Sequence, residues 1–387
     1  MARTIEHAAE RRKPGRADNL AAGRALAAAA LAVLVGTASP VLARDPLRQP
    51  FATDSIWNMP IGSQARYVDP RLPFDLMGRN TKLTKLDEEI IVLRPDAPLT
   101  PIHKNEAGWT GRNRCEPQGP ELGQIPLPDD FVVPDNRENG SAAILLPDRR
   151  TVVQVQPLTR CRAGGPATAL VAFSPLDLYG PGMTGAHGGS NLSALGGSLR
   201  VGELRPGGPA PAHALKLLVD ARLALYPCKA AQHCFRWPAS TADDYAVGRY
   251  GKDNPGAVAA MRMGALLAIP QDADLAALGL ETEPGRLLAS TLQGYGAYVV
   301  DDSFGDGFGF TAETGPDGRF ATQFRKDHGF DFVTRLGDAT PWSRDAARLL
   351  KALRVVDNNA AVSVGGGGKP IRPLAEELVP PAAVKRP

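Results

Sequence analysis

The segment HALKLLVDARLAL, residues 213–225, carries the most regular hydrophobic pattern in the chain. One parity holds His213, Leu215, Leu217, Val219, Ala221, Leu223 and Leu225, while Lys216, Asp220 and Arg222 fall on the other. Alternation with a period of two is typical of a β-strand that buries one face. We therefore expect one long, half-buried strand over this segment.

The segments around it predict further strands. AAILLP and TVVQVQP flank Asp148-Arg149-Arg150, and GFGFTAE and RFATQF flank a turn that contains Pro-Asp-Gly, so each pair predicts a β-hairpin. Shorter strands are predicted in EEIIVL, TALVAFS, SLRVGEL and AYVVDD. The sequence is thus rich in short strands joined by turns.

Helices are predicted in few places. One begins at Pro284 and ends before Gly294, and another begins at Thr340 with Pro341 in its first turn. PGAVAAMRMGALLA fits either a buried helix or a strand. Many strands with few helices predict a mainly β fold, a β-sandwich, jelly-roll-like or barrel domain with a few peripheral helices.

The N-terminal segment predicts export. Residues 1–43 combine a basic start, a short alanine-rich apolar run and Val-Leu-Ala as a cleavage site, as in a signal peptide. The apolar run is too short to span a bilayer. We expect one β-rich domain over residues 44–368 and an extended, proline-rich tail over residues 369–387.

Charge and location follow from that division. The leader holds six of the 44 basic residues and three of the 41 acidic ones, so the remaining chain is formally neutral. A neutral chain predicts no nucleic-acid partner, and the lack of a long apolar run predicts no stable membrane span. We expect a secreted or periplasmic protein.

Four cysteines follow the leader: Cys115, Cys161, Cys228 and Cys234. An even number in an exported chain predicts two disulfides, for which three pairings are possible. Because Cys228 and Cys234 lie close in sequence, we favour that pair together with Cys115–Cys161. The alternative, a metal site, lacks a C-x-x-C motif and a paired histidine.

Several familiar catalytic and cofactor motifs are absent. The run GGGGK before Pro370 lacks the Ser or Thr of a phosphate-binding loop, and Ser190 lacks a complete G-x-S-x-G motif. We predict no cofactor and no metal, although a divalent ion near Asp301 in DDSFGDG stays an alternative.

The stretch GAHGGSNLSALGGSLRVGEL, residues 185–204, offers the main candidate site. Its glycines allow the backbone to approach a ligand, while His187 supplies a titratable group and Asn191 an amide. On a strand, Arg200 and Glu203 would face opposite sides unless Gly202 formed a bulge. Tight turns around a buried histidine are the structural alternative.

Other candidates lie outside that stretch. Asp301 and Asp302 follow the apolar strand AYVV, so one carboxylate would leave each face of a sheet; a capping role for Asp302 is the alternative. Trp57 and Asn58 in SIWNMPI are candidates for substrate binding, because apolar sugar faces stack on aromatic rings.

One string resembles a known family. LRVGELR, residues 199–205, resembles the R-S-E-L-R strand of alginate-lyase-type β-sandwich polysaccharide lyases, with one residue more between Arg200 and Glu203. The family's Q-I/V-H and Y-x-x-G-x-Y-x-Q motifs have no match here. The resemblance covers seven residues and implies a polysaccharide lyase. Other motifs, such as HGGSNLSALGG, are similar to those of secreted bacterial proteins and assign no functional residue.

Two functions are compatible with these candidates. The first is a secreted carbohydrate-active enzyme that cleaves a polysaccharide. Hydrolysis would use Glu203 with Asp301 or Asp302 as paired carboxylates, whereas elimination would use His187 as base and Arg200 to stabilise developing charge. The second is a non-catalytic glycan-binding protein of the cell envelope. A purely structural exported protein that binds no small ligand is the remaining alternative.

Overall fold

The computed structural model describes residues 44–110, 113–136 and 138–380. The chain divides into two units, Met1–Leu42 and Ala43–Pro387. All elements described here belong to the second unit, and the predicted signal peptide lies outside the described residues. Residues 369–380 of the predicted tail contain no helix or strand, and the rest of that tail is likewise outside the description.

The second unit is mainly β, with 26% strand against 16% helix, as the sequence predicts. The strands are β1 (Tyr67–Val68), β2 (Lys82–Leu93), β3 (Leu99–Lys104), β4 (Glu121–Pro126), β5 (Ala142–Leu145), β6 (Thr151–Gln156), β7 (Ala167–Ala169), β8 (Val171–Ala172), β9 (Leu176–Asp177), β10 (Thr184–His187), β11 (Leu215–Val219), β12 (Leu266–Ala268), β13 (Ala297–Asp302), β14 (Gly307–Gly315), β15 (Gly318–Arg319), β16 (Thr334–Arg335) and β17 (Arg354–Val356). The helices are α1 (Ala221–Ala224), α2 (Ala246–Arg249), α3 (Glu283–Gly294), α4 (Phe320–His328) and α5 (Pro341–Ala352). Single 3₁₀ turns cover Ala231–His233, Ala276–Leu278 and Val364–Gly366.

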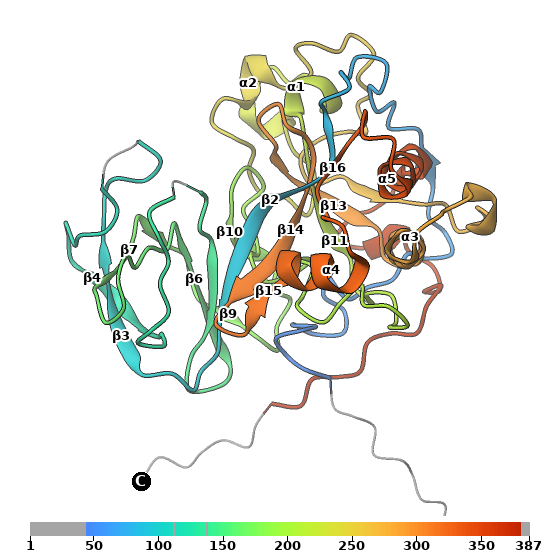
Figure 1. The fold of residues 1–387 in the computed structure, drawn as a ribbon. Helices are drawn as coiled ribbons and strands as arrows, with labels where there is room; N and C mark the ends of the chain where they lie inside the picture. Colours follow the sequence, from blue (N-terminus) through green and yellow to red (C-terminus); the bar gives the residue numbers. More distant parts are fainter. Residues whose placement is uncertain (1–43, 111–112, 137, 381–387) are drawn as a thin grey trace, which may run out of the picture. The chain divides into compact units, whose positions relative to one another are not determined.

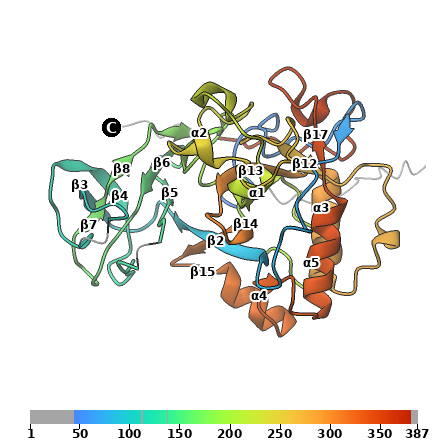
Figure 2. The same ribbon diagram turned by 90° about the horizontal axis from the view of Figure 1, so that it is seen from above.

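The described strands form two sheets. The larger has thirteen strands in the order β1-β17-β12-β13-β11-β14-β2-β5-β6-β8, with β15, β16 and β9 beside this path. It is mixed, because β11 runs parallel to β13, and β2 runs parallel to both β14 and β5. The smaller sheet, β4-β3-β7, lies beside β5 and β6 in both views (Figures 1 and 2). A β-sandwich or closed barrel is not confirmed.

Both faces of the central strands are buried. Leu215, Leu217 and Val219 of β11 pack in one core with α3, α4 and α5, which lie on one side of the sheet (Figure 2). Leu218, on the other face, packs in a second core with Trp57 and residues around β10. Strands covered on both sides do not need an alternating pattern.

This double burial corrects the prediction for residues 213–225. The strand covers only Leu215–Val219, all of it buried, because Asp220 accepts a hydrogen bond from the backbone of Arg222 and begins helix α1. Lys216 is fully buried, although its parity predicted solvent. Its ammonium donates to the carbonyls of Ser193 and Ala194 at 3.0 and 2.7 Å.

Two further strand predictions are wrong in part. RFATQF forms helix α4 after two strand residues, because Phe320 and Phe324 recur at helical spacing and pack together with Phe332 and Trp342. In SLRVGEL only Leu199 bridges β14, at Ala312. The next residues form a turn in which Glu203 accepts a hydrogen bond from the backbone of Arg200.

Other local predictions are confirmed. The hairpin of β5 and β6, the strand AYVVDD and helices α3 and α5 lie where the sequence places them, with Thr282 and Thr340 as N-caps. The ambiguous segment ends in strand β12. Both favoured disulfides, Cys115–Cys161 and Cys228–Cys234, are present. Among the described residues, no helix has the length and apolar character needed to cross a membrane.

Candidate functional site

The structure brings His187 and Asp301 together at the ends of β10 and β13. Nδ1 of His187 lies 3.5 Å from Oδ2 of Asp301, and the histidine ring is fully buried. The other oxygen of Asp301 accepts backbone hydrogen bonds from Gly189 and Asp302, at 3.1 and 2.9 Å. We call His187, Asp301 and Asp243, which is described next, the acid site.

Asp243 joins the site from the loop before α2. The hydroxyl of Tyr250 donates to its Oδ2 at 2.5 Å. Burial, together with the charge of Asp301, raises the pKa of Asp243 to about 7. Burial likewise raises the pKa of Asp301 to about 6, against the lowering effect of its two backbone hydrogen bonds. Near neutral pH both carboxyl groups are therefore protonated more readily than an exposed aspartate.

Two glycines of the Gly-rich stretch face these carboxyl groups. A Cβ atom on Gly188 would lie 2.3 Å from Oδ2 of Asp301, and one on Gly189 would lie 2.8 Å from Oδ2 of Asp243. Any larger residue would displace the carboxyl groups. The glycines thus serve a close approach of backbone to two acids.

Asp302, the neighbour of Asp301 in β13, makes structural contacts beside the acid site. It accepts hydrogen bonds from the backbone of Ala221 and Phe304, at 3.0 and 2.9 Å, and from Nε of Arg249 at 2.8 Å. Its side chain has no exposed area. These contacts fit a capping role for Asp302 better than a role in contacting substrate.

An aromatic pair lies at the surface beside the acid site. The rings of Tyr245 and Phe304 meet edge to face at 5.9 Å, and the guanidinium of Arg249 lies 4.1 Å from the centre of the Phe304 ring. Phe304 is 70% exposed and Tyr245 is 37% exposed. Phe304 also has a φ of +55°, which is unusual for a residue with a side chain. We name this pair the aromatic platform.

Arg200 and Glu203 lie at the other end of the central strands. Oε1 of Glu203 lies 3.0 Å from Nε2 of His213, and Nε of Arg200 lies 3.3 Å from Glu313. His213 precedes β11, whereas Asp301 pairs with Leu218 near the end of that strand. At about 3.3 Å per residue, the start of β11 is already roughly 10 Å from Leu218. Glu203 thus forms an ion pair with histidine, apart from Asp301 and Asp302.

The remaining sequence candidates have structural contacts. Trp57 is 1% exposed and donates to the carbonyl of Gly182, and Asn58 is fully buried and donates to the carbonyls of Pro50 and Ala52. Neither side chain is accessible to a polysaccharide here. Asn191, with a φ of +54°, donates to the hydroxyl of Ser240.

Sequence reasoning missed Asp243, Tyr250 and the aromatic platform. Asp243, Tyr245 and Tyr250 lie in ADDYAVGRY, a short segment around helix α2 in which acids and tyrosines are concentrated. That concentration was a usable signal. Its link to Asp301 was not visible, because the two segments meet only through the tertiary fold.

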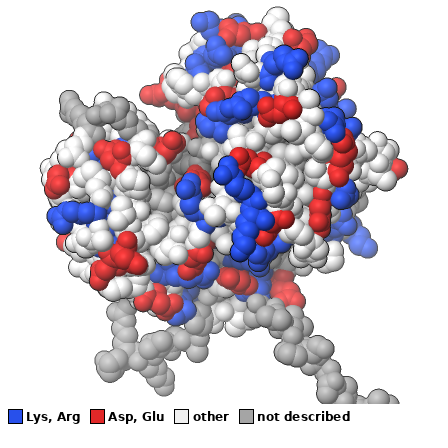
Figure 3. All heavy atoms as spheres, viewed as in Figure 1, with Lys and Arg blue, Asp and Glu red and all other residues white. Residues whose placement is uncertain are grey.

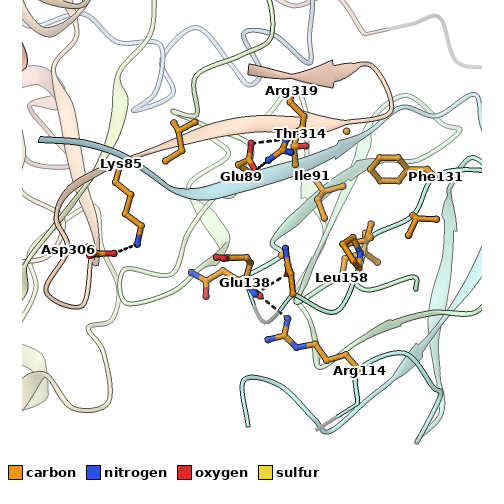
Figure 4. Close-up of a pocket in the computed structure, with 18 of the residues that line it drawn as sticks. Lys85, Glu89, Ile91, Arg114, Phe131, Glu138, Leu158, Asp306, Thr314 and Arg319 are labelled. Atoms are coloured by element: carbon orange, nitrogen blue, oxygen red, sulfur yellow. Dashed lines mark hydrogen bonds and ion pairs between the residues drawn. The ribbon is translucent and has the colours of Figure 1, made fainter. Parts of the chain in front are cut away.

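A separate cavity of about 690 Å³ opens beside β2 (Figure 4). Its walls come from β2, β14 and β15 on one side and from residues 131–134, 136 and 138–140, Arg114 and Leu158 on the other. Lys85 and Asp306 lie at one end (Figure 4), and Lys82 also contacts Asp306. On the face drawn in Figure 3, acidic and basic side chains are intermingled.

The described residues contain no group of three or more His, Cys, Asp or Glu side chains arranged to hold a metal ion. No family model, no curated protein and no solved structure matches this chain. The candidate site therefore stands on its own geometry.

Proposed function

We propose that the protein is an exported enzyme that hydrolyses a polysaccharide, with Asp243 and Asp301 as its acid–base pair. The observation that carries the proposal is the pair of carboxyl groups with raised pKa values, about 7 and about 6, beside an exposed aromatic platform. Glycoside hydrolysis uses two carboxyl groups, one protonated and one ionised. Aromatic rings offer the apolar surface on which a sugar ring stacks.

The pKa values suggest the roles. Asp243, with the higher pKa, donates its proton to the glycosidic oxygen as the bond to the anomeric carbon breaks. Asp301, ionised at lower pH, takes a proton from the water whose oxygen bonds to that carbon. The products are two shorter chains, one with a new reducing end. His187 acts as a positioning residue that holds Asp301.

Hydrolysis is better supported than elimination. The elimination scheme needs His187 as base and Arg200 as a cation near the same sugar. The ring of His187 is fully buried, and Arg200 is 2% exposed and lies at the other end of β11. The resemblance of LRVGELR to a lyase strand gains no support, because these residues form a turn.

Export is part of the proposal. Two disulfides and the absence of a membrane-spanning helix among the described residues are compatible with an extracellular or periplasmic location. The predicted signal peptide is the further reason for proposing secretion.

The test is incubation of the purified protein with neutral and acidic polysaccharides, with assays for reducing ends and for the ultraviolet absorbance of unsaturated products. We expect new reducing ends without that absorbance. Asp301→Asn and Asp243→Asn should each lower turnover at least 100-fold. Asp244→Asn, which changes the exposed neighbour of Asp243, is the matched control and should keep activity.

The alternative is glycan binding without catalysis, which the exposed Tyr245 and Phe304 favour. In that case the protein would bind a polysaccharide, and Asp301→Asn would leave binding unchanged, but no substrate in the panel would be cleaved. Unsaturated products that persist in Asp243→Asn would contradict the hydrolytic proposal.

A further inference from the structure

The cavity beside β2 has two different ends. At one end, Lys85 extends toward Asp306; at the other, Ile91, Phe131 and Leu158 form an apolar wall (Figure 4). Val132, also in the lining, is 39% exposed. A volume of about 690 Å³ lies within the range of small-molecule sites.

Charged groups in the lining already pair with one another. Lys82 and Lys85 both contact Asp306, at 3.2 and 2.7 Å, and Arg319 forms an ion pair with Glu89. Arg114 donates to the carbonyls of Gly108 and Glu138. A charged ligand would compete with these existing partners for the charged groups of the lining.

The lining therefore selects against two ligand classes. A wholly apolar ligand would remove water from the ion pairs without replacing its hydrogen bonds. An ionic ligand would compete with the partner that each charged group already has. A neutral ligand rich in hydroxyl groups avoids both costs, because each hydroxyl donates to a carboxylate and accepts from an ammonium or guanidinium.

The cavity lies close to the acid site along the chain. Asp306, at one end of the cavity, follows Phe304 of the aromatic platform by two residues in the loop between β13 and β14. Two residues of extended chain span at most about 7 Å. One ligand chain can thus reach both places.

We propose that this cavity binds a neutral oligosaccharide segment, several sugar units of the same chain that the acid site cleaves. Sugar hydroxyls contact the Lys85–Asp306 and Arg319–Glu89 pairs, and an apolar sugar face lies against Phe131. The identity of the chain rests on the proposed function. Binding in the cavity is separable from catalysis.

The experiment measures binding by retardation in native gels that contain soluble xylan, galactomannan or mixed-linkage β-glucan, with polygalacturonate as the anionic comparison. The inactive variant Asp301→Asn serves as the parent, so that no chain is cut during the run. We expect at least one neutral polysaccharide to retard it. Phe131→Ala and Arg319→Met in this parent should each weaken retardation about tenfold.

Arg325→Met is the matched control, because Arg325 forms an exposed ion pair with Asp331 in the helix that follows Arg319. Its retardation should equal that of the parent. The inference is overturned if no neutral chain retards the parent, if only polygalacturonate does, or if the cavity variants bind like the control.

The two proposals fail in different ways. Cavity-dependent retardation without turnover by the wild-type protein would contradict the acid site but keep the cavity as a glycan-binding site. Turnover by the wild-type protein, with cavity variants that bind normally, would keep the acid site and remove the cavity from substrate binding.

Discussion

At the scale of single residues, the protein places titratable groups where burial works against their charge. Asp243 accepts a hydrogen bond from the hydroxyl of Tyr250, and Asp301 accepts one from the backbone of Gly189, so that neutral donors orient both carboxyl groups. Their pKa values are therefore raised. Perturbed pKa values of this kind occur more often at functional sites than elsewhere in proteins.

Asp243 should make the protein less stable as pH rises. Its folded pKa of about 7 exceeds the unfolded value of 3.8, so the folded state binds more protons between these values and loses stability through that window. Relative to Asp243→Asn, we expect the wild type to lose on the order of 2 kcal/mol between pH 5 and pH 8. Urea unfolding at both pH values measures this, with Asp244→Asn as control. An equal loss in Asp243→Asn would contradict the assignment.

Glu203 should matter for stability, by way of His213. Burial lowers the pKa of His213, but the charge and hydrogen bond of Glu203 outweigh it and raise the pKa overall. The stabilisation is complete below about 6.5 and is lost as pH rises through the folded pKa. We expect Glu203→Gln to cost about 3 kcal/mol at pH 6 and less at higher pH.

A double-mutant cycle with His213→Gln tests this pair by urea unfolding. The coupling energy should fall with rising pH. A variant Glu203→Gln that keeps its stability but loses all turnover would instead return Glu203 to the catalytic site.

At the scale of elements, the parallel strands β11 and β13 determine where the acid site forms. β11 lies between β13 and β14, and both β10 and the loop before α2 reach the end of β13 that carries Asp301. Lys216 of β11 holds the Gly-rich loop through the carbonyls of Ser193 and Ala194. The loop in turn donates to Asp301 through Gly189.

Gly188→Ala should remove activity while leaving the fold intact. The added Cβ would overlap Oδ2 of Asp301 at 2.3 Å, and a misplacement of about 1 Å costs roughly 100-fold in rate. Turnover of the susceptible polysaccharide and the urea midpoint should be compared with Gly78→Ala, where a Cβ would meet nothing within 4 Å. Unchanged turnover in Gly188→Ala would argue against Asp301 as a reacting group.

At the scale of the whole molecule, the two disulfides cross-link different regions. Cys115–Cys161 closes a loop of 46 residues that includes β4, β5 and β6, whereas Cys228–Cys234 closes one of six. The loss of chain entropy in the unfolded state grows with loop length. The longer bridge should therefore stabilise the fold more.

We expect the double variant Cys115→Ser/Cys161→Ser to lose about 4 kcal/mol and Cys228→Ser/Cys234→Ser about 2 kcal/mol. Urea unfolding of both variants and of the wild type measures the two losses. Equal losses, or a larger one for the short loop, would show that native contacts near Cys228 and Cys234 outweigh the entropy of loop closure.

Local patterns predicted the elements whose contacts are local. The β5–β6 hairpin, helices α3 and α5 with their threonine caps, and the Cys228–Cys234 loop each involve residues close in sequence. The predictions failed where partners are distant. The alternating pattern predicts that Lys216 faces solvent, but its side chain is buried. Its hydrogen bonds to the carbonyls of Ser193 and Ala194 make this burial possible.

The sequence by itself determined the mainly β class and the capped helices and favoured the observed pairing of the cysteines, because capping residues and the close spacing of Cys228 and Cys234 act over short distances. It also singled out His187, Asp301 and the glycines between residues 185 and 204. Only the tertiary structure decided that Asp243 joins Asp301 while Glu203 pairs with His213 at the other end of β11. The physical reason is that parallel strand pairing brings distant segments to one edge, and no local pattern records which ones meet.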